Sequence, residues 1–222
     1  MPGYQTRKLN IRVGAFTGRL RALLDHNQYA DPGDAIERAG ISSANWSLFG
    51  QLWPASRALA AAVKHLDLKG RRILELGCGL ALPSLVLQWR GADITASDHH
   101  PLSKEFLDYN TAQNKLPEIP YLDLPWADTA TQVGHFDVIL GSDILYERDH
   151  APLLASLIQR IAAPCAKVLI TCPGRGYGNR FSGKLTALGF TLTETRIPFS
   201  DSEAPPFKGR LLSYQRSGTG FQ

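Results

Sequence analysis

Residues 73–84, ILELGCGLALPS, combine a continuous apolar strand, a Gly-x-Gly turn and the start of a helix. This order is typical of an α/β sheet, in which a glycine turn lets the backbone approach a ligand and a helix N-terminus favours negative charge. In a dinucleotide fingerprint a third glycine would follow, but that position is Leu82. Because the third glycine permits tight helix–strand packing beneath a pyrophosphate, its absence argues against NAD and against an NAD-linked oxidoreductase.

Two carboxylates near this turn restrict the ligand further. Glu75 lies inside the strand, where a buried carboxylate needs a partner and would repel a phosphate, so it suits a cationic ligand or hydrogen-bond donors. Asp98 ends the next predicted strand, 19 residues after Gly79, and a carboxylate there can accept both hydroxyls of a ribose. This spacing is compatible with a dinucleotide and with any other nucleoside ligand.

From residue 53 onward, predicted helices and strands alternate. The helices are 53–66, 82–91, 101–115, 150–163 and 180–189; the strands are 71–77, 93–98, 119–124, 136–143, 166–172, 190–199 and 207–216. This alternation predicts a parallel sheet with helices on both faces. Because no helix separates the last two strands, they should form an antiparallel hairpin. The predicted fold class is therefore α/β, a Rossmann-like, seven-stranded, mostly parallel sheet.

The N-terminal residues carry a different pattern. Apolar side chains recur at roughly helical spacing over residues 5–25, and they are Leu9, Val13, Phe16, Leu20, Leu23 and Leu24. We expect an amphipathic helix there that packs on the domain surface, with a partner-binding helix as the alternative. The predicted organisation is an N-terminal helical extension, residues 1–50, followed by one domain, residues 51–222.

Composition limits the location and the partners. The N-terminus lacks the apolar region of a secretory signal, and no apolar run approaches the ~20 residues that span a bilayer. Three cysteines without paired spacing argue against disulfides and zinc and favour a reducing cytoplasm. The net charge of +4 hides an acidic middle, residues 92–159, with net −8. Because phosphate binding needs cations near the site, nucleic acid is not the expected partner.

The glycine turn resembles the first motif, Glu-x-Gly-x-Gly, of the class I S-adenosylmethionine-dependent methyltransferases, whose seven-stranded sheet ends in a hairpin. The resemblance covers about residues 51–216 and implies S-adenosylmethionine as the cofactor of a methyltransferase domain, residues 51–222. Ala81 departs from the third glycine of many members. Cys78, in a variable position, is interpreted as a small filler.

The resemblance also assigns cofactor-binding residues. Glu75, Gly77 and Gly79 would shape the pocket for the methionine part, with Glu75 reaching donors on or near its amino group, and Asp98 would hold the ribose. In the segment LDLPWAD, Trp126 would stack on the adenine, with Asp123 as the alternative. The remaining predicted cofactor-binding residues are Trp53, Cys78 and Ser142.

The predicted acceptor site lies at the end of the strand FDVILGSD, residues 136–143. Ligands of open α/β sheets bind outside the carboxyl ends of the strands, and in this fold the fourth strand is next to the first. Asp143 and Tyr146 are therefore predicted catalytic residues at the floor of the acceptor site. A carboxylate beside an aromatic ring suits an amine, because Asp143 can orient it and Tyr146 offers a π face or a hydroxyl.

The Asp-x-x-Tyr spacing, with an upstream Trp and the LDLPW segment, resembles the seven-β-strand protein-lysine methyltransferase family, methyltransferase family 16. The Asn/Asp-Pro-Pro-Tyr/Phe signature of base and glutamine methylation is absent, since the sequence reads SDILY there. The implied partner is a protein that carries the target lysine. Alternatives are an N-methyltransferase for a small-molecule amine or nucleic acid, and a non-catalytic module that binds nucleosides or partners. The sequence does not indicate an oligomeric state.

Two adjacent histidines, His99 and His100, follow Asp98. A histidine pair can suggest a metal, but adjacent residues that leave a strand point apart. We interpret them as solvated loop residues and predict no metal site.

Overall fold

The computed structural model describes residues 4–25, 46, 48–174, 176–197 and 207–218. Seven strands form one sheet in the order β5-β4-β3-β6-β7-β9-β8. The strands are β3 (Arg72–Leu76), β4 (Asp93–Asp98), β5 (Tyr121–Asp123), β6 (Phe136–Ser142), β7 (Ala162–Cys172), β8 (Thr191–Ile197) and β9 (Gly209–Arg216). β3 to β7 pair in parallel, whereas β9 is antiparallel to both of its neighbours. The predicted Rossmann-like sheet and its terminal hairpin are confirmed.

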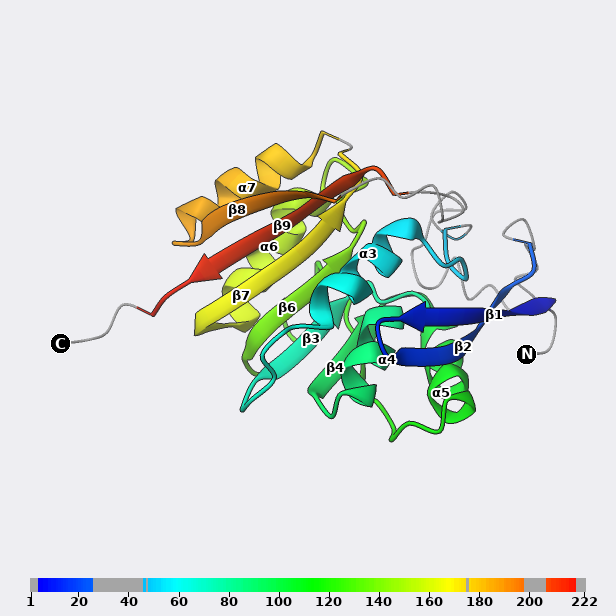
Figure 1. The fold of residues 1–222 in the computed structure, drawn as a ribbon. Helices are drawn as coiled ribbons and strands as arrows, with labels where there is room; N and C mark the ends of the chain where they lie inside the picture. The colour runs from blue at the N-terminus through cyan, green and yellow to red at the C-terminus, as the bar shows by residue number, and fades with distance from the viewer. Residues whose placement is uncertain (1–3, 26–45, 47, 175, 198–206, 219–222) are drawn as a thin grey trace.

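Helices cover both faces of the sheet (Figure 1). They are α3 (Pro54–Val63), α4 (Leu82–Trp89), α5 (Ser103–Gln113), α6 (His150–Ile161) and α7 (Gly178–Ala187). α3, α4 and α5 lie on one face, and α6 and α7 lie on the other. None of the described helices is both long and apolar enough to cross a membrane.

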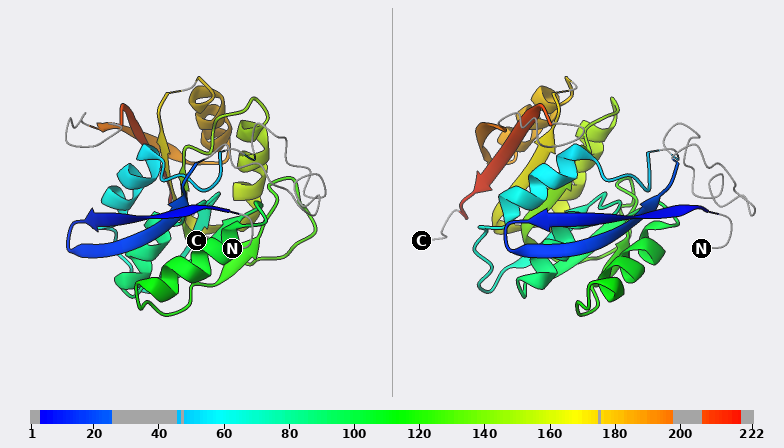
Figure 2. Two further views of the ribbon diagram at one scale, coloured as in Figure 1. Left: turned by 90° about the vertical axis from the view of Figure 1, so that its right-hand side faces the viewer. Right: turned by 45° about the vertical axis from the view of Figure 1, so that its right-hand side comes forward.

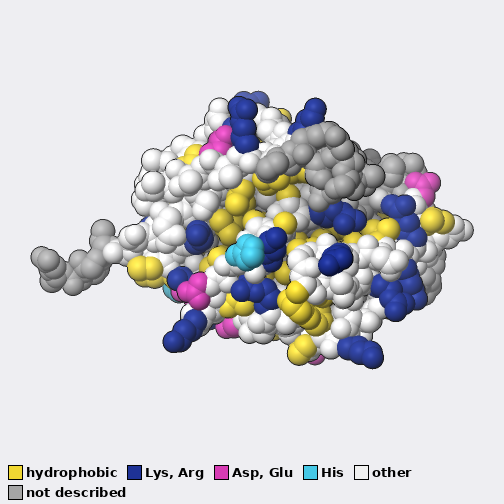
Figure 3. All heavy atoms as spheres, in the orientation of Figure 1, with side chains coloured by type: hydrophobic (Ala, Val, Ile, Leu, Met, Phe, Trp, Pro, Cys, Tyr) yellow, Lys and Arg dark blue, Asp and Glu magenta, His cyan; other side chains and the backbone are white. Residues whose placement is uncertain are grey.

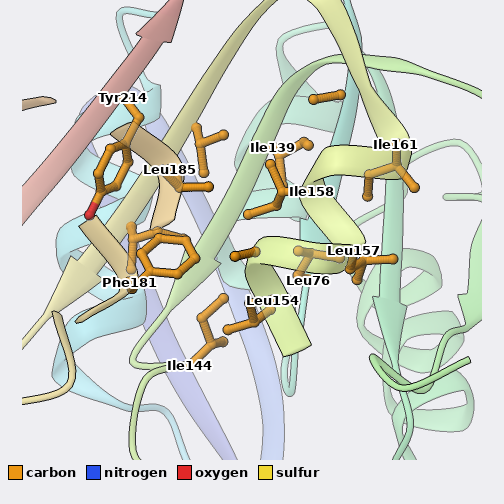
Figure 4. Packing of buried hydrophobic residues seen from close by; sticks show 14 of the residues in the cluster. Leu76, Ile139, Ile144, Leu154, Leu157, Ile158, Ile161, Phe181, Leu185 and Tyr214 are labelled. Carbon is orange, nitrogen blue, oxygen red and sulfur yellow. The ribbon is translucent and has the colours of Figure 1, made fainter. Parts of the chain in front are cut away.

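The core under α6 and α7 joins side chains of the sheet with those of both helices (Figure 4). Side chains of β6, such as Ile139, meet Ile158 of α6, while Phe181 of α7 packs edge-on against Tyr214 of β9 with ring centroids 5.5 Å apart. The central strand β6, whose residues 138–141 are buried, has apolar contacts on both faces, which explains its nearly continuous hydrophobic sequence.

The expected helix over residues 5–25 is wrong. Residues 6–23 form an antiparallel hairpin of β1 (Thr6–Val13) and β2 (Phe16–Leu23), with Gly14 at a φ of +58° in the two-residue turn. Leu9, Ile11 and Val13 alternate with polar residues in β1, and this period of two is an alternative to the helical spacing on which the helix prediction is based. The strands form because the hairpin can bury its inward face against α4 and α5.

The hairpin forms a further layer outside α4 and α5 (Figure 2). Ile11, Phe16 and Leu20 join a buried cluster with Leu82 and Leu85 of α4. Amide side chains of α5 and of the residue that ends it satisfy the outer edge of β2: Asn110 accepts a hydrogen bond from Arg21 N at 2.6 Å, and Asn114 accepts one from Arg19 N at 2.8 Å. An edge strand covered in this way cannot recruit another strand. The boundary predicted at residue 50 stays a prediction.

If the hairpin belongs to the folded domain, truncating its core should weaken the whole protein. Leu20 is 1% exposed, so Leu20→Ala should lower the free energy of unfolding by about 2–5 kcal/mol, measured by urea denaturation. Leu24→Ala is the control, because Leu24 is 50% exposed and a surface change should cost less than about 0.5 kcal/mol. Equal stabilities of the two variants would contradict this packing.

Candidate active site

A cavity of about 740 Å³ lies at the carboxyl ends of β3, β4 and β6, within the range of roughly 300–1,000 Å³ that is usual for ligand pockets. Nine of the ten predicted site residues line it: Trp53, Gly77, Cys78, Gly79, Asp98, Trp126, Ser142, Asp143 and Tyr146. The tenth, Glu75, is fully buried behind the residues that line the cavity. The structure thus brings residues from five separate segments to one place, while their individual roles stay predictions.

The glycine turn needs glycine for two different reasons. Gly77 and Gly79 have φ values of +58° and +54°, in the left-handed region that side chains disfavour. A Cβ on Gly77 would also lie 3.0 Å from Cγ2 of Ile144 and 3.4 Å from the Trp126 ring, whereas one on Gly79 would meet open space. Ala81 adopts the same conformation at a φ of 58°, which explains why a third glycine would suit this position.

Glu75 holds the start of α4 and does not face the cavity. Its Oε2 accepts hydrogen bonds from the Ser84 backbone N–H at 2.9 Å and from the Ser84 hydroxyl, while Oε1 is buried without a hydrogen-bond partner in the described residues. Burial raises the pKa of the Glu75 carboxyl to about 8, against the opposing effect of the Ser84 bonds. The proposed contact with a ligand's amino group therefore stays a prediction, and Glu75 acts here as a support of the turn.

Asp98 connects β4 to the glycine turn. Its carboxylate accepts backbone hydrogen bonds from Gly79 at 2.8 Å, His99 at 2.8 Å and His100 at 2.9 Å. Burial raises the pKa of Asp98, and the three backbone donors oppose that rise. The carboxylate is thus held rigidly at the cavity wall, at the place expected for a ribose-binding acid.

The acceptor end of the cavity begins with a sharp turn after β6. Asp143 has a φ of +52°, a left-handed conformation that Asp tolerates better than most residues, and its N–H donates to the Thr171 carbonyl at 2.8 Å. Strained positions of this kind are concentrated at functional sites. Burial raises the pKa of the Tyr146 phenol to about 12, so at neutral pH the phenol is protonated and can donate a hydrogen bond.

Sequence reasoning missed His150, the first residue of α6. Its ring packs edge-on against Tyr146, with centroids 4.4 Å apart, and against Trp126, with centroids 4.9 Å apart. Nδ1 lies 3.0 Å from the Ile144 carbonyl oxygen, which can only accept, so Nδ1–H donates; Nε2 lies 3.4 Å from Oε2 of Glu147, and burial lowers the pKa of the imidazole. His150 therefore fixes both predicted ligand-contacting rings. A signal was present, because a helix that follows a strand of this sheet begins at its carboxyl edge.

The interpretation of His100 as a solvated loop residue is wrong. His100 is 7% exposed and lies between Phe49, stacked at 4.0 Å, and Trp46, at 4.1 Å, and burial lowers its pKa to about 3. Phe49 also lines the cavity. Nothing in the local pattern shows that an aromatic segment some fifty residues earlier folds over this loop.

His99 differs from its neighbour, because it is 39% exposed and its Nδ1 lies 3.1 Å from Oδ1 of Asp123. Asp123, the alternative adenine contact, does not line the cavity; Trp126 does. Within the described segments, no group of three or more His, Cys, Asp and Glu side chains is placed to hold a metal ion.

The fold places the chain in a structural class. The *Thermus thermophilus* 16S rRNA N2 G1207 methyltransferase, solved with AdoMet and guanosine, superimposes with a TM-score of 0.68 and 17% identity, over 96% of this chain and 51% of that one. At that identity the likeness concerns the fold alone, which is the Rossmann-like fold of methyltransferases.

The sequence comparison defines the family. A model of the lysine methyltransferase family matches residues 40–183, more than half of the chain, and the chain belongs to this family. Protein N-lysine methyltransferase METTL21A of *Danio rerio* is 30% identical over 142 residues, 59% of this chain and 64% of that protein. EEF1A lysine methyltransferase 3 of *Xenopus tropicalis* is 26% identical over 153 residues, 66% of this chain and 67% of that protein. The match to the zebrafish protein thus spans less than two thirds of its length.

The raised pKa of Glu75 predicts how the free energy of unfolding depends on pH. The carboxyl binds a proton in the folded protein up to about pH 8 but loses it near 4.5 when unfolded. Because the folded state binds more protons between these values, stability should fall as pH rises through this window, by about 1.4 kcal/mol per pH unit at most. Because a glutamine at this position would not titrate, the unfolding free energy of Glu75→Gln minus that of the natural protein should increase from pH 5 to 8, measured by urea denaturation at each pH. Parallel pH profiles would rule out the raised pKa.

Proposed function

We propose that the protein is an S-adenosylmethionine-dependent methyltransferase that methylates a lysine side chain of a protein substrate. The observation that supports it most is that Asp143 and Tyr146 line the same cavity as the glycine turn and Asp98, in a chain of the lysine methyltransferase family. The named relatives modify lysines of proteins, which is the basis for extending that acceptor to this chain.

The cavity suits the proposed cofactor. The turn at Gly77 and Gly79 leaves backbone exposed to the cavity, Asp98 offers carboxylate oxygens for ribose hydroxyls, and Trp126 offers an apolar ring for a base. When bound, S-adenosylmethionine would supply a methyl group attached to a positively charged sulfur. An acidic lining is compatible with that charge, whereas it would oppose the phosphates of a dinucleotide.

The acceptor residues have to receive a cation and prepare it for attack. A lysine amine with its ordinary pKa near ~10.4 is protonated at pH 7 and has no free lone pair. In this proposal Asp143 attracts and orients the ammonium group, and the protonated Tyr146 phenol and its ring define the side from which it enters. Once the ammonium group has passed its proton to the Asp143 carboxylate or to water, the same contacts hold its lone pair on the donor side of the cavity.

We place the enzyme in the cytoplasm in this proposal. Cys78, Cys165 and Cys172 are all free thiols, which suits a reducing compartment. Burial raises the pKa of the Cys78 thiol well above its usual range, so the thiol stays protonated beside the cavity, in agreement with its interpretation as a filler.

Asp98 should determine cofactor affinity. Asp98→Asn preserves the size of the side chain but removes its charge, and it should raise the dissociation constant for S-adenosylmethionine about ten- to hundredfold, since a hydrogen bond to a charged group contributes about 1.5–3 kcal/mol. Isothermal titration calorimetry measures this. Asp123→Asn is the matched control on the neighbouring strand β5 and should bind like the natural protein. A larger loss of S-adenosylmethionine affinity in Asp123→Asn than in Asp98→Asn would indicate that Asp123, and not Asp98, contacts the nucleoside.

Asp143 should act on the acceptor and leave cofactor binding intact. Asp143→Asn retains a residue that tolerates the left-handed backbone, and it should lower transfer of a radiolabelled methyl group into lysate protein about ten- to hundredfold. Asp149→Asn removes an exposed acid of the same loop and should retain full transfer. Unchanged incorporation in Asp143→Asn would remove Asp143 from the acceptor site.

The labelled product also identifies the acceptor class. Label that is sensitive to protease and located on lysine by mass spectrometry supports the proposal, whereas label in nucleic acid or in a small amine overturns it. Calorimetric binding of S-adenosylmethionine without transfer to any lysate fraction would instead favour the non-catalytic module.

A further inference from the structure

The hairpin of β1 and β2 is unusually cationic. Residues 4–24 contain five Lys and Arg residues and no Asp or Glu. Because side chains alternate along a strand, Leu9, Ile11 and Val13 point inward, which leaves the neighbouring positions on the outside. The outer face therefore carries Lys8, Arg12, Arg19 and Arg21, and we call these four residues the cationic face. Figure 3 shows Lys and Arg side chains spread over the region that the hairpin occupies in Figure 1.

The register brings like charges together on this face. Lys8 lies directly opposite Arg21, a cross-strand arrangement that destabilises a sheet. Arg21 stacks on the Tyr109 ring, with Cζ 3.6 Å from the centroid. Across the described segments, no ion pair joins Lys8, Arg12 or Arg19 to a carboxylate. The repulsion is thus not compensated by carboxylates of the described segments, whereas an anionic partner could compensate it.

The cationic face is a fixed surface. Asn110, Gln113 and Asn114 bind the backbone of Arg19 and Arg21, and the inward face of the hairpin is buried. The hairpin is also joined to the rim of the cavity, since Leu23 N donates to the Gly50 carbonyl at 2.9 Å and Gly50 lines the cavity. A ligand that enters the cavity can therefore extend toward this face.

The two neighbouring surfaces have opposite charge. The cavity is lined by the acids Asp98, Asp143 and Glu147, whereas the cationic face has only positive side chains. A nucleic acid would find cations on the hairpin but carboxylates at the cavity, and its continuous phosphate charge matches only one of them. A lysine within an acidic protein segment matches both, since its ammonium group suits the cavity and its carboxylates suit the hairpin.

We propose that the cationic face of the hairpin binds Asp and Glu side chains that flank the target lysine, so that the substrate class is an acidic protein segment with an embedded lysine. This inference rests on the proposed function, because it takes the occupant of the cavity to be a lysine. It adds a docking surface outside the cavity that selects the partner by charge.

The test uses a fluorescein-labelled peptide with one central lysine between runs of glutamate, and a matched peptide with glutamine in place of glutamate. Binding to the full chain is followed by fluorescence anisotropy and methyl transfer is followed separately. The test variant is Lys8→Glu/Arg19→Glu. The control is Lys69→Glu/Arg196→Glu, which has the same change in net charge on exposed cations elsewhere. Each variant places one new glutamate opposite an arginine, Arg21 or Arg210, so both should fold, as thermal melting will verify.

The acidic peptide should bind about tenfold more tightly than the glutamine peptide at low salt, and only the hairpin variant should lose about tenfold in affinity, because charge complementarity governs such contacts. Equal affinities for the two peptides, or equal losses in both variants, would overturn the inference. Tighter binding of a single-stranded oligonucleotide of equal charge, lost in the hairpin variant, would also overturn it in favour of nucleic acid. Selective binding of the acidic peptide without methylation would support the docking surface and count against the proposed function.

Discussion

The site depends on the three backbone hydrogen bonds that Asp98 accepts. One of them, from Gly79, ties the turn after β3 to the end of β4, and the other two hold the loop at His99 and His100. A further hydrogen bond between the same turn and β4 runs from Cys78 N to the Ser97 carbonyl oxygen at 2.9 Å. Without these bonds the glycine turn, with its left-handed residues, would lack a defined position. One half-buried carboxylate at the cavity wall therefore organises two neighbouring loops.

Electrostatics around the cavity follow from burial. Desolvation raises the pKa values of Glu75 and Asp98 and lowers that of His150, so each group is shifted toward its neutral form. A cationic ligand would reverse this shift for the carboxylates, because it favours their charged form. An acidic pocket beside a cationic hairpin thus separates the two signs of charge in space, and the chain's net charge of +4 conceals that separation.

Much of the central sheet could be predicted because its strands are buried on both faces. The apolar runs at 73–76 and 136–140 have few alternative structures, and the ends of such strands meet at one edge. That rule, together with the resemblance to the methyltransferases, brought Asp98, Asp143 and Trp126 together in the prediction. Glu75 shows the limit of the rule, since a residue within a strand can face either a ligand or a helix, and here Ser84 of α4 is its partner.

The sequence by itself determined the α/β order, the glycine turn, the terminal hairpin and the residues at the carboxyl edge, because these depend on contacts between neighbours in the chain and on strand burial. Only the tertiary structure decided that residues 6–23 are strands, that His100 is buried between Trp46 and Phe49, and that His150 supports Tyr146. In each of these cases the local pattern allows two outcomes. The packing of residues far apart in the sequence selects one, because burial of apolar surface outweighs a weak local preference.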